Sequence, residues 1–123
     1  MPVIRVEVPK GTPLKIRQRL RAGVKQAVLD TLAPKETKYD YVAVREVFAE
    51  IGDGVPLVTV DLRPGREPER KQALADTIAA LLKAELDVDP QDVYVLYRET
   101  PAENHYTGGK PLPPWVPASQ LTA

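Results

Sequence analysis

The sequence repeats itself once, and this repeat limits the folds open to the chain more than any other feature. When Pro2 is aligned with Pro56, PVIRVEVPKGTP lies over PLVTVDLRPGRE. A second match follows after a shift of one residue, where REVFAE, which begins at Arg45, lies over RETPAE, which begins at Arg98. A chain with an internal repeat builds one supersecondary unit per copy, so both halves should share one local structure.

Each copy is predicted to be a strand, a helix and a second strand. Residues 3–8 and 57–62 alternate apolar and polar side chains, which is the period of a half-buried strand. Each copy then closes with a further predicted strand, over 41–47 in the first and over 93–97 in the second.

The helices between these strands have clear start signals and an apolar stripe. The first is predicted to begin with Thr12 as its N-cap and Pro13 in its first turn, and the second to begin at about Pro68. Apolar residues then recur at helical spacing. They are Ile16, Leu20, Val24, Ala27, Val28 and Leu32 in the first helix, and Leu74, Ile78, Leu81, Leu82 and Leu86 in the second.

A strand-helix-strand unit makes a right-handed crossover between two parallel strands. We therefore predict an α/β (α+β) fold in which two tandem β-α-β units form a four-stranded sheet with two helices on one face. We expect a single domain over 1–123, with repeats at about 2–50 and 56–103. Because both sides of the strands carry Val, Leu and Tyr, self-association is expected to cover the other face.

The C-terminal tail, residues 110–123, contains the run PLPPWVP. Its prolines favour an extended polyproline conformation, and a disordered end is the alternative. Trp115 is a large apolar group to leave in water, so we expect it to pack on a neighbouring subunit.

Composition excludes several classes of function. Lys plus Arg and Asp plus Glu both number 17, so no charge excess points to nucleic acid or to an anionic membrane. The absence of cysteine excludes disulfides and a thiol nucleophile, and one histidine makes a His-based metal site improbable. No segment has the apolar length of a membrane span, and the charged start is not a signal peptide. We expect a cytoplasmic protein without a metal.

Pro2 is the most unusual candidate for chemistry. Cells normally remove methionine before a small residue, which would leave a proline with a free secondary amine. An α-amine titrates near pH ~8, and apolar surroundings and nearby cations lower its pKa toward working pH, where it is a good proton acceptor. Taken alone, Met-Pro is also an ordinary chain start.

The second candidate is the RPGR turn of residues 63–66, between a predicted strand and a predicted helix. The guanidiniums of Arg63 and Arg66 beside a helix N-terminus would make an anion-binding corner. A solvated turn is the alternative reading.

The third candidate is the segment ENHYTGG of residues 103–109, whose glycines predict a tight turn after His105 and Tyr106. A lone histidine is more often a structural hydrogen-bonding residue than a base. The simplest interpretation of three strand tyrosines, Tyr41, Tyr94 and Tyr97, is that they pack within the sheet. The alternative is that a tyrosine hydroxyl lines the wall of a pocket.

Together, the start PVIRVEV, the two strand-turn-helix copies and ENHYTGG resemble the tautomerase superfamily of 4-oxalocrotonate tautomerase, over about residues 2–109. The resemblance implies an amino-terminal proline as general base and, for chains with two fused units, a homotrimer. Pro2 matches the catalytic proline. Arg66 matches the family's turn arginine, whereas the first copy has Thr12 there, and the family's strand arginine is absent near Tyr41 and Tyr94.

The turn LRPGR is also similar to that of cis-3-chloroacrylic acid dehalogenase, in which two arginines matched by Arg63 and Arg66 hold the substrate carboxylate. That relative's helix histidine and late glutamate are replaced by Leu29 and Thr107, which counts against hydrolytic dehalogenation. The chain is similar to malonate semialdehyde decarboxylase too, and Asp40 is the nearest match to its loop aspartate.

The resemblance and the residues lead to one functional prediction. The chain is expected to be a keto-enol tautomerase for small 2-keto acids or enol pyruvates, without a cofactor, and with no nucleic acid or membrane partner. Pro2 would be the base, Arg63 and Arg66 would bind the carboxylate, and Tyr41, His105 and Tyr106 would line the substrate site. A proline-dependent hydratase, dehalogenase or decarboxylase on three-carbon acids, and a non-catalytic trimer that binds small acids, remain the alternatives.

Overall fold

The computed structural model describes residues 2–32, 41–47 and 56–116. The helices and strands, in chain order, are β1 (Val3–Val8), α1 (Leu14–Leu32), β2 (Tyr41–Glu46), β3 (Leu57–Leu62), α2 (Pro68–Leu86), the short helix η1 (Pro90–Asp92), β4 (Tyr94–Glu99), the short helix η2 (Ala102–Asn104), β5 (Tyr106–Thr107) and β6 (Lys110–Pro111). The sequence-based expectations for Met1 and Asp40 lie outside the described residues.

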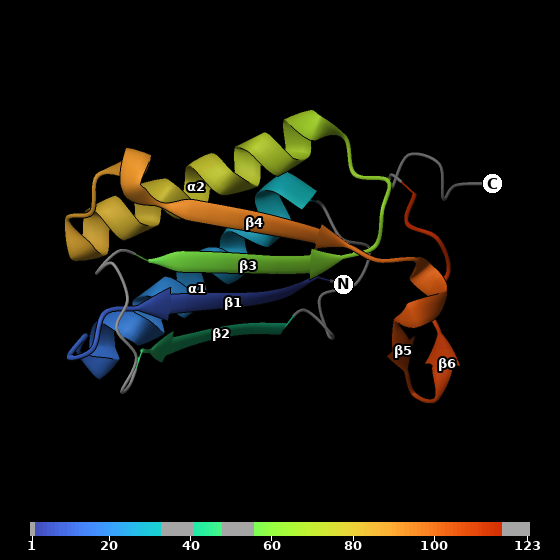
Figure 1. Cartoon of the computed structure of the whole chain (residues 1–123), viewed down its shortest axis with the longest axis horizontal. Coiled ribbons are helices and arrows are strands. Elements are labelled where there is room, and N and C mark those ends of the chain that lie inside the picture. Colours follow the sequence, from blue (N-terminus) through green and yellow to red (C-terminus); the bar gives the residue numbers. More distant parts are fainter. Residues whose placement is uncertain (1, 33–40, 48–55, 117–123) are drawn as a thin grey trace.

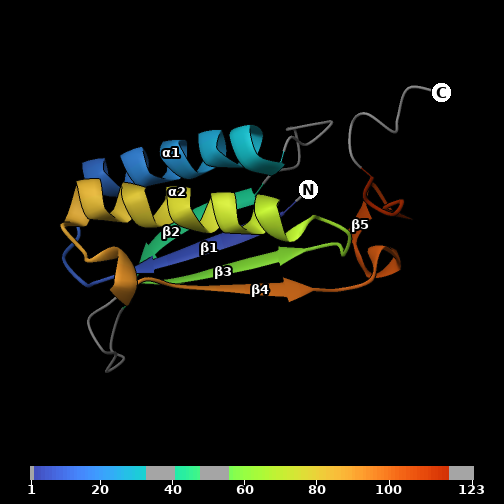
Figure 2. The ribbon, with the colours of Figure 1, turned by 90° about the horizontal axis from the view of Figure 1, so that it is seen from above.

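The four long strands form one mixed sheet in the order β2-β1-β3-β4. β1 is parallel to β2 and β3 is parallel to β4, whereas the two central strands, β1 and β3, are antiparallel. Both long helices cover the same face of this sheet, as the view from above shows (Figure 2). The predicted fold class, two β-α-β units with both helices on one face, is confirmed.

The core lies between the sheet and the two long helices. It forms where the alternating apolar residues of the strands face the apolar residues that recur at helical spacing along the helices. Alternate residues of the central strands are buried, and the predicted helix stripes supply most of the facing residues. The buried set is Ile4, Val6, Val8, Leu20, Val24, Ala27, Val28, Leu32, Val42, Val58, Val60, Leu62, Leu74, Ile78 and Leu82.

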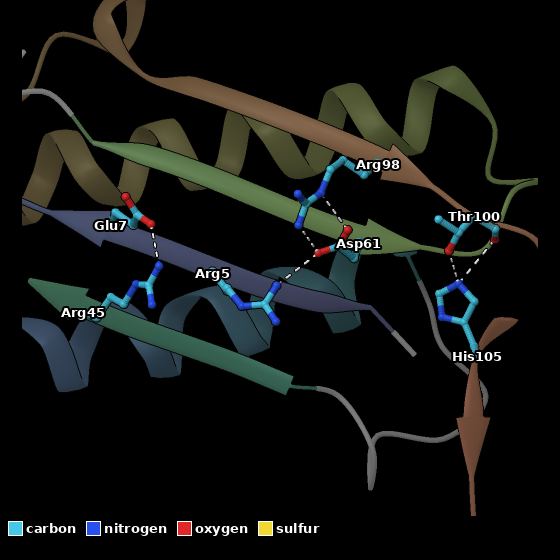
Figure 3. Close-up of polar contacts among 7 residues, drawn as sticks. All are labelled: Arg5, Glu7, Arg45, Asp61, Arg98, Thr100 and His105. Carbon is cyan, nitrogen blue, oxygen red and sulfur yellow. Dashed lines mark hydrogen bonds and ion pairs between the residues drawn. The ribbon is translucent and has the colours of Figure 1, made fainter. Parts of the chain in front are cut away.

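The repeat is also visible on the sheet face away from the helices. Glu7 is paired in register with Arg45, and Asp61 with Arg98, which are equivalent positions in the two copies. Both pairs form ion pairs, at 2.7 Å between Arg45 Nη2 and Glu7 Oε1 and at 2.8 Å between Arg98 Nε and Asp61 Oδ1 (Figure 3). Arg5 adds a third cation at 3.1 Å from Asp61 Oδ2.

Two local predictions differ from the structure. α1 begins at Leu14, and the hydroxyl of Thr12 does not cap it but donates to the carbonyl of Pro9 at 2.7 Å. Thr12 therefore closes the turn after β1 by donating from its hydroxyl, whereas an N-cap hydroxyl would accept from a backbone N–H of the helix. The closing strands are shifted by one or two residues from the predicted 41–47 and 93–97.

Neither α1 nor α2, the long helices of the described part of the chain, has the apolar character that crossing a membrane would require.

Leu20 and Leu14 lie on the same helix and test the core directly. Leu20→Ala should lower the free energy of unfolding by about 2–5 kcal/mol, because it leaves a cavity at a fully buried position. Leu14→Ala, at a side chain that is 58% exposed, should change it by no more than about 0.5 kcal/mol. Urea denaturation of both variants gives the comparison, and equal effects would contradict this description of the core.

Asp61 should titrate below the ordinary range. Hydrogen bonds from Arg98, followed by the charges of Arg98 and Arg5, lower the pKa of Asp61 against the opposing effect of its burial. The unfolded chain has an ordinary value of about 3.9, so the ion-paired carboxylate stabilises the fold above that pH, and this contribution is lost as the pH falls through the folded-state pKa. A carboxyl ¹³C NMR titration should show the pKa of Asp61 rise in Arg98→Met. It should stay unchanged in Arg19→Met, whose guanidinium pairs with Glu85.

Candidate functional site

The antiparallel pairing of β1 with β3 places the start of the chain beside the end of β3. Val3 pairs with Asp61, so Pro2 lies level with the last residue of β3, immediately before the RPGR turn. Pro2 is buried, and its carbonyl accepts a hydrogen bond from the backbone N–H of Tyr41 at 3.2 Å. Three predicted site segments, Pro2, Tyr41 and the turn, are thus brought to one end of the sheet (Figure 1).

The three strand tyrosines lie at different places on the sheet. Tyr41 opens β2 at this end with 54% of its side chain exposed, so it can border a ligand. Tyr94 opens β4 at the opposite end, because β4 runs parallel to β3. The hydroxyl of Tyr97 donates to the carbonyl of Lys71 at 2.7 Å on the helix face, and burial raises the pKa of Tyr97 to about 12. Tyr97 is therefore a packing residue, as one of the two sequence interpretations predicted.

The RPGR turn is compact and strongly positive. Gly65 has a φ of +119°, a conformation that side-chain-bearing residues avoid. Arg66 is 4% exposed, and its Nη1 donates to the carbonyl of Arg63 at 2.9 Å. Burial lowers the pKa of Arg63, although an arginine still keeps its charge near neutral pH. Both guanidiniums lie close to the N-terminus of α2, whose dipole also favours an anion.

The tail covers this turn. We call Leu112–Val116 the tail strap. The backbone N–H of Leu112 donates to the carbonyl of His105 at 2.7 Å, and Arg63 Nη1 donates to the carbonyl of Pro113. The ring of Trp115 then lies against Arg66, with 4.8 Å between the guanidinium carbon and the ring centroid.

Trp115 has a packing partner within its own chain. Its indole lies against Arg66 and, at 5.7 Å, Arg70, and its packing on a neighbouring subunit stays a prediction. A large apolar indole is expected to be shielded from water, but a cation–π partner leaves no periodic pattern in a sequence. The one available signal was the presence of several arginines at the start of α2.

His105 and Tyr106 lie in a small hairpin that projects from the same end of the sheet (Figure 1). Gly108 and Gly109, with φ of 58° and 78°, form its turn, and a Cβ on either would meet nothing within 4 Å. These glycines therefore serve the backbone conformation of the tight turn that the sequence predicts. Tyr106 is 64% exposed.

His105 is tied into its own loop. Its Nε2 lies 2.6 Å from the hydroxyl oxygen of Thr100 and 3.3 Å from the carbonyl oxygen of the same residue (Figure 3). This is the structural hydrogen-bonding role that a lone histidine most often has. Its part in substrate binding stays a prediction.

The assembled end of the sheet can hold a small acid beside a potential base. It combines the buried nitrogen position of Pro2, a half-exposed tyrosine and two arginines, and this set suits carboxylate binding and proton transfer. Within residues 2–32, 41–47 and 56–116, no group of three or more Asp, Glu or His side chains is placed to hold a metal ion.

Comparisons with known proteins match either one β-α-β unit of the chain or both units together. A family model described as tautomerase enzyme matches residues 56–113, which contain the second β-α-β unit. Probable tautomerases of Bacillus cereus and Bacillus anthracis are each 39% identical over 59 residues, which cover 47% of this chain and 95% of the relative.

Solved structures match both units together. A fused 4-OT, described as an asymmetric trimer, is 22% identical, with a TM-score of 0.80 over 98% of this chain and 99% of that chain. N1, a member of the cis-3-chloroacrylic acid dehalogenase family, is also 22% identical, with a TM-score of 0.79 over 97% and 87%. A malonate semialdehyde decarboxylase is 20% identical, with a TM-score of 0.68 over 86% and 90%. At these identities the likeness is one of fold.

The bacterial relatives are matched over nearly their whole length, and the family model falls on the unit that carries the arginine turn. The chain therefore belongs to the tautomerase family of enzymes.

Proposed function

We propose that this chain is a keto-enol tautomerase of small 2-keto acids or enol pyruvates and that the amino-terminal proline is its general base. The observation that carries this proposal is the position of Pro2. It is buried at the start of β1, level with the end of β3, where Arg63 and Arg66 follow. Removal of Met1 would turn the nitrogen at this position into a secondary amine.

The proposed reaction needs only proton transfer and charge stabilisation. The neutral amine of Pro2 takes a proton from the carbon next to the ketone; the electrons of the C–H bond form a C=C bond, and the π electrons of the carbonyl move to its oxygen to give an enolate. The ammonium of Pro2 then returns the proton, to the oxygen in forming the enol or to carbon in the reverse direction. Arg63 and Arg66 pair with the carboxylate and stabilise the developing negative charge.

The charges around Pro2 support this role. A free α-amine has a pKa of about 8, and cations nearby favour the neutral form that accepts a proton. We propose that Tyr41, His105 and Tyr106 border the substrate. Tyr41 has the best support, because its backbone is hydrogen-bonded to Pro2 and its side chain is half exposed.

A second candidate function uses the same proline as an acid. Hydration, dehalogenation or decarboxylation of a three-carbon acid is favoured by the RPGR turn and by the fold likeness to N1 and to the decarboxylase. Leu29 on α1 and Thr107 in β5 count against hydrolytic dehalogenation, since neither side chain can act as a base at neutral pH. A non-catalytic trimer that binds small acids is the alternative if Met1 is retained.

We propose that the active form is a cytoplasmic homotrimer. Fused 4-OT structures are described as trimers. In this chain the sheet face without helices carries the large exposed side chains of Tyr41, Leu57, Tyr94 and Leu96, and a second copy would remove them from water.

Activity should follow the fraction of molecules that begin at Pro2. A chain that keeps Met1 has an amide nitrogen at this position, and an amide cannot accept a proton at neutral pH. Intact-mass spectrometry paired with tautomerisation rates on an enol pyruvate gives the correlation. The pH profile of kcat/KM should show an ionisation below about 8. Pro2→Ala should keep part of the activity, because its amine is primary but similarly placed. Full activity in protein that retains Met1 would end the proposal.

Arginine variants should act mainly on acids. Arg66→Ala, and to a smaller extent Arg63→Ala, should lower kcat/KM for a 2-keto acid by a factor that corresponds to about 1.5–3 kcal/mol, the value of a charge-assisted hydrogen bond. Arg19→Ala, at an exposed arginine of α1 that pairs with Glu85, is the matched control and should be unchanged. If both turn variants retain wild-type efficiency on the acid, the carboxylate binds elsewhere.

A further inference from the structure

We propose that Trp115 is a positioning residue for carboxylate recognition, and that the tail strap holds the guanidinium of Arg66 in the orientation that binds the acid. This inference rests on the proposed function, which assigns Arg63 and Arg66 to the substrate carboxylate. It adds a residue outside the RPGR turn that acts on substrate only through the arginine.

The contact between Trp115 and Arg66 is the first support. The guanidinium carbon lies 4.8 Å from the ring centroid, within the range in which an aromatic ring attracts a cation. Arg66 is 4% exposed, so this attraction is little screened by water.

The chemistry of stacking makes such a contact compatible with binding. The N–H donors of a guanidinium lie in its plane, whereas an aromatic ring packs against its face. One in-plane donor of Arg66, Nη1, is already used by the carbonyl of Arg63, and any further oxygen that restrained the guanidinium would take another donor. Trp115 can restrain the guanidinium without using a donor, which is what a positioning residue must do.

Two hydrogen bonds tie the strap to the rest of the chain and keep the indole against the turn. Leu112 is hydrogen-bonded to the carbonyl of His105, and the carbonyl of Pro113 accepts from Arg63. A Cβ on Gly65 would lie 3.4 Å from the carbonyl oxygen of Trp115 and 3.5 Å from its Cε3, which shows how closely the strap approaches the turn. The prolines at 111, 113 and 114 restrict the backbone between these contacts.

Arg63 retains donor capacity under the strap. Its Nη1 is used by the Pro113 carbonyl, but its Nε, which is buried, has no hydrogen-bond partner among the described residues. A buried donor without an acceptor is costly, and an incoming carboxylate oxygen would satisfy it. Arg63 thus keeps one unused donor beneath the strap, next to the turn that also carries Arg66.

The test measures binding of pyruvate by calorimetry to the full chain and to three variants. Trp115→Leu should weaken pyruvate binding about tenfold, which corresponds to about 1.4 kcal/mol. Trp115→Phe keeps an aromatic face and should recover most of that loss. Leu14→Ala removes an apolar side chain that is 58% exposed at the far end of the sheet, and it should bind pyruvate as the wild type does.

Kinetics separate positioning from a structural role. For an enol pyruvate, Trp115→Leu should raise KM more than it lowers kcat, because the carboxylate that Arg66 binds is present in both ground state and transition state. For the methyl ester of the same compound, which offers no carboxylate, the loss in kcat/KM should be clearly smaller. Equal losses on acid and ester would show that the indole only supports the fold and would overturn the inference.

The remaining outcomes are also decisive. Trp115 is the one tryptophan of the chain, so its emission should change when pyruvate saturates the wild type, and a constant emission would contradict the proposal. Wild-type protein that fails to bind pyruvate would overturn it as well. Wild-type protein that binds pyruvate but turns over no enol pyruvate would count against the proposed tautomerase. The calorimetric comparison of the Trp115 variants would still decide the inference.

Discussion

The antiparallel pairing of β1 with β3 is the interaction on which the other features of this chain depend. It joins the two β-α-β units at the centre of the sheet, with Val3 opposite Asp61 and Glu7 opposite Leu57. Buried residues of both strands then face the helices as one continuous layer. The same pairing brings the start of each central strand beside the end of the other, and so it creates two similar corners, one at each end of the sheet.

The two corners differ in chemistry because the repeat has diverged. At one corner, Pro2 follows Met1 in the sequence, and Arg63 and Arg66 follow β3. At the other, Pro56 is internal, so its nitrogen is an amide. There the turn after β1 is closed by the hydroxyl of Thr12 on the Pro9 carbonyl. If Met1 is removed as we propose, the first corner would offer an amine beside two arginines, whereas the second would offer only an amide beside Thr12, so a pseudo-symmetric fold would have one reactive end.

Much of this fold could be predicted from the sequence, because the repeat gave the topology and the apolar periods gave the core. YVAVRE of β2 and YVLYRE of β4 occupy equivalent strands, and their arginines form equivalent ion pairs. The pattern could not decide the role of Thr12, since a capping hydroxyl and a turn-closing hydroxyl look alike in sequence. Nor could it find the Trp115 contact, which depends on where a non-repetitive tail returns in space.

The register of β1 against β3 also decides which charged residues lie near the proposed site. Asp61, opposite the residue that follows Pro2, would by itself raise the pKa of an amine there and keep it protonated. Its charge is instead matched by two arginines, Arg98 and Arg5. Arg63 and Arg66, which follow β3, then add positive charge at this end of the sheet. Cations disfavour the protonated form of a nearby amine, so in the proposed mechanism the ion pairs on the open sheet face and the RPGR turn would together help Pro2 to act as a base.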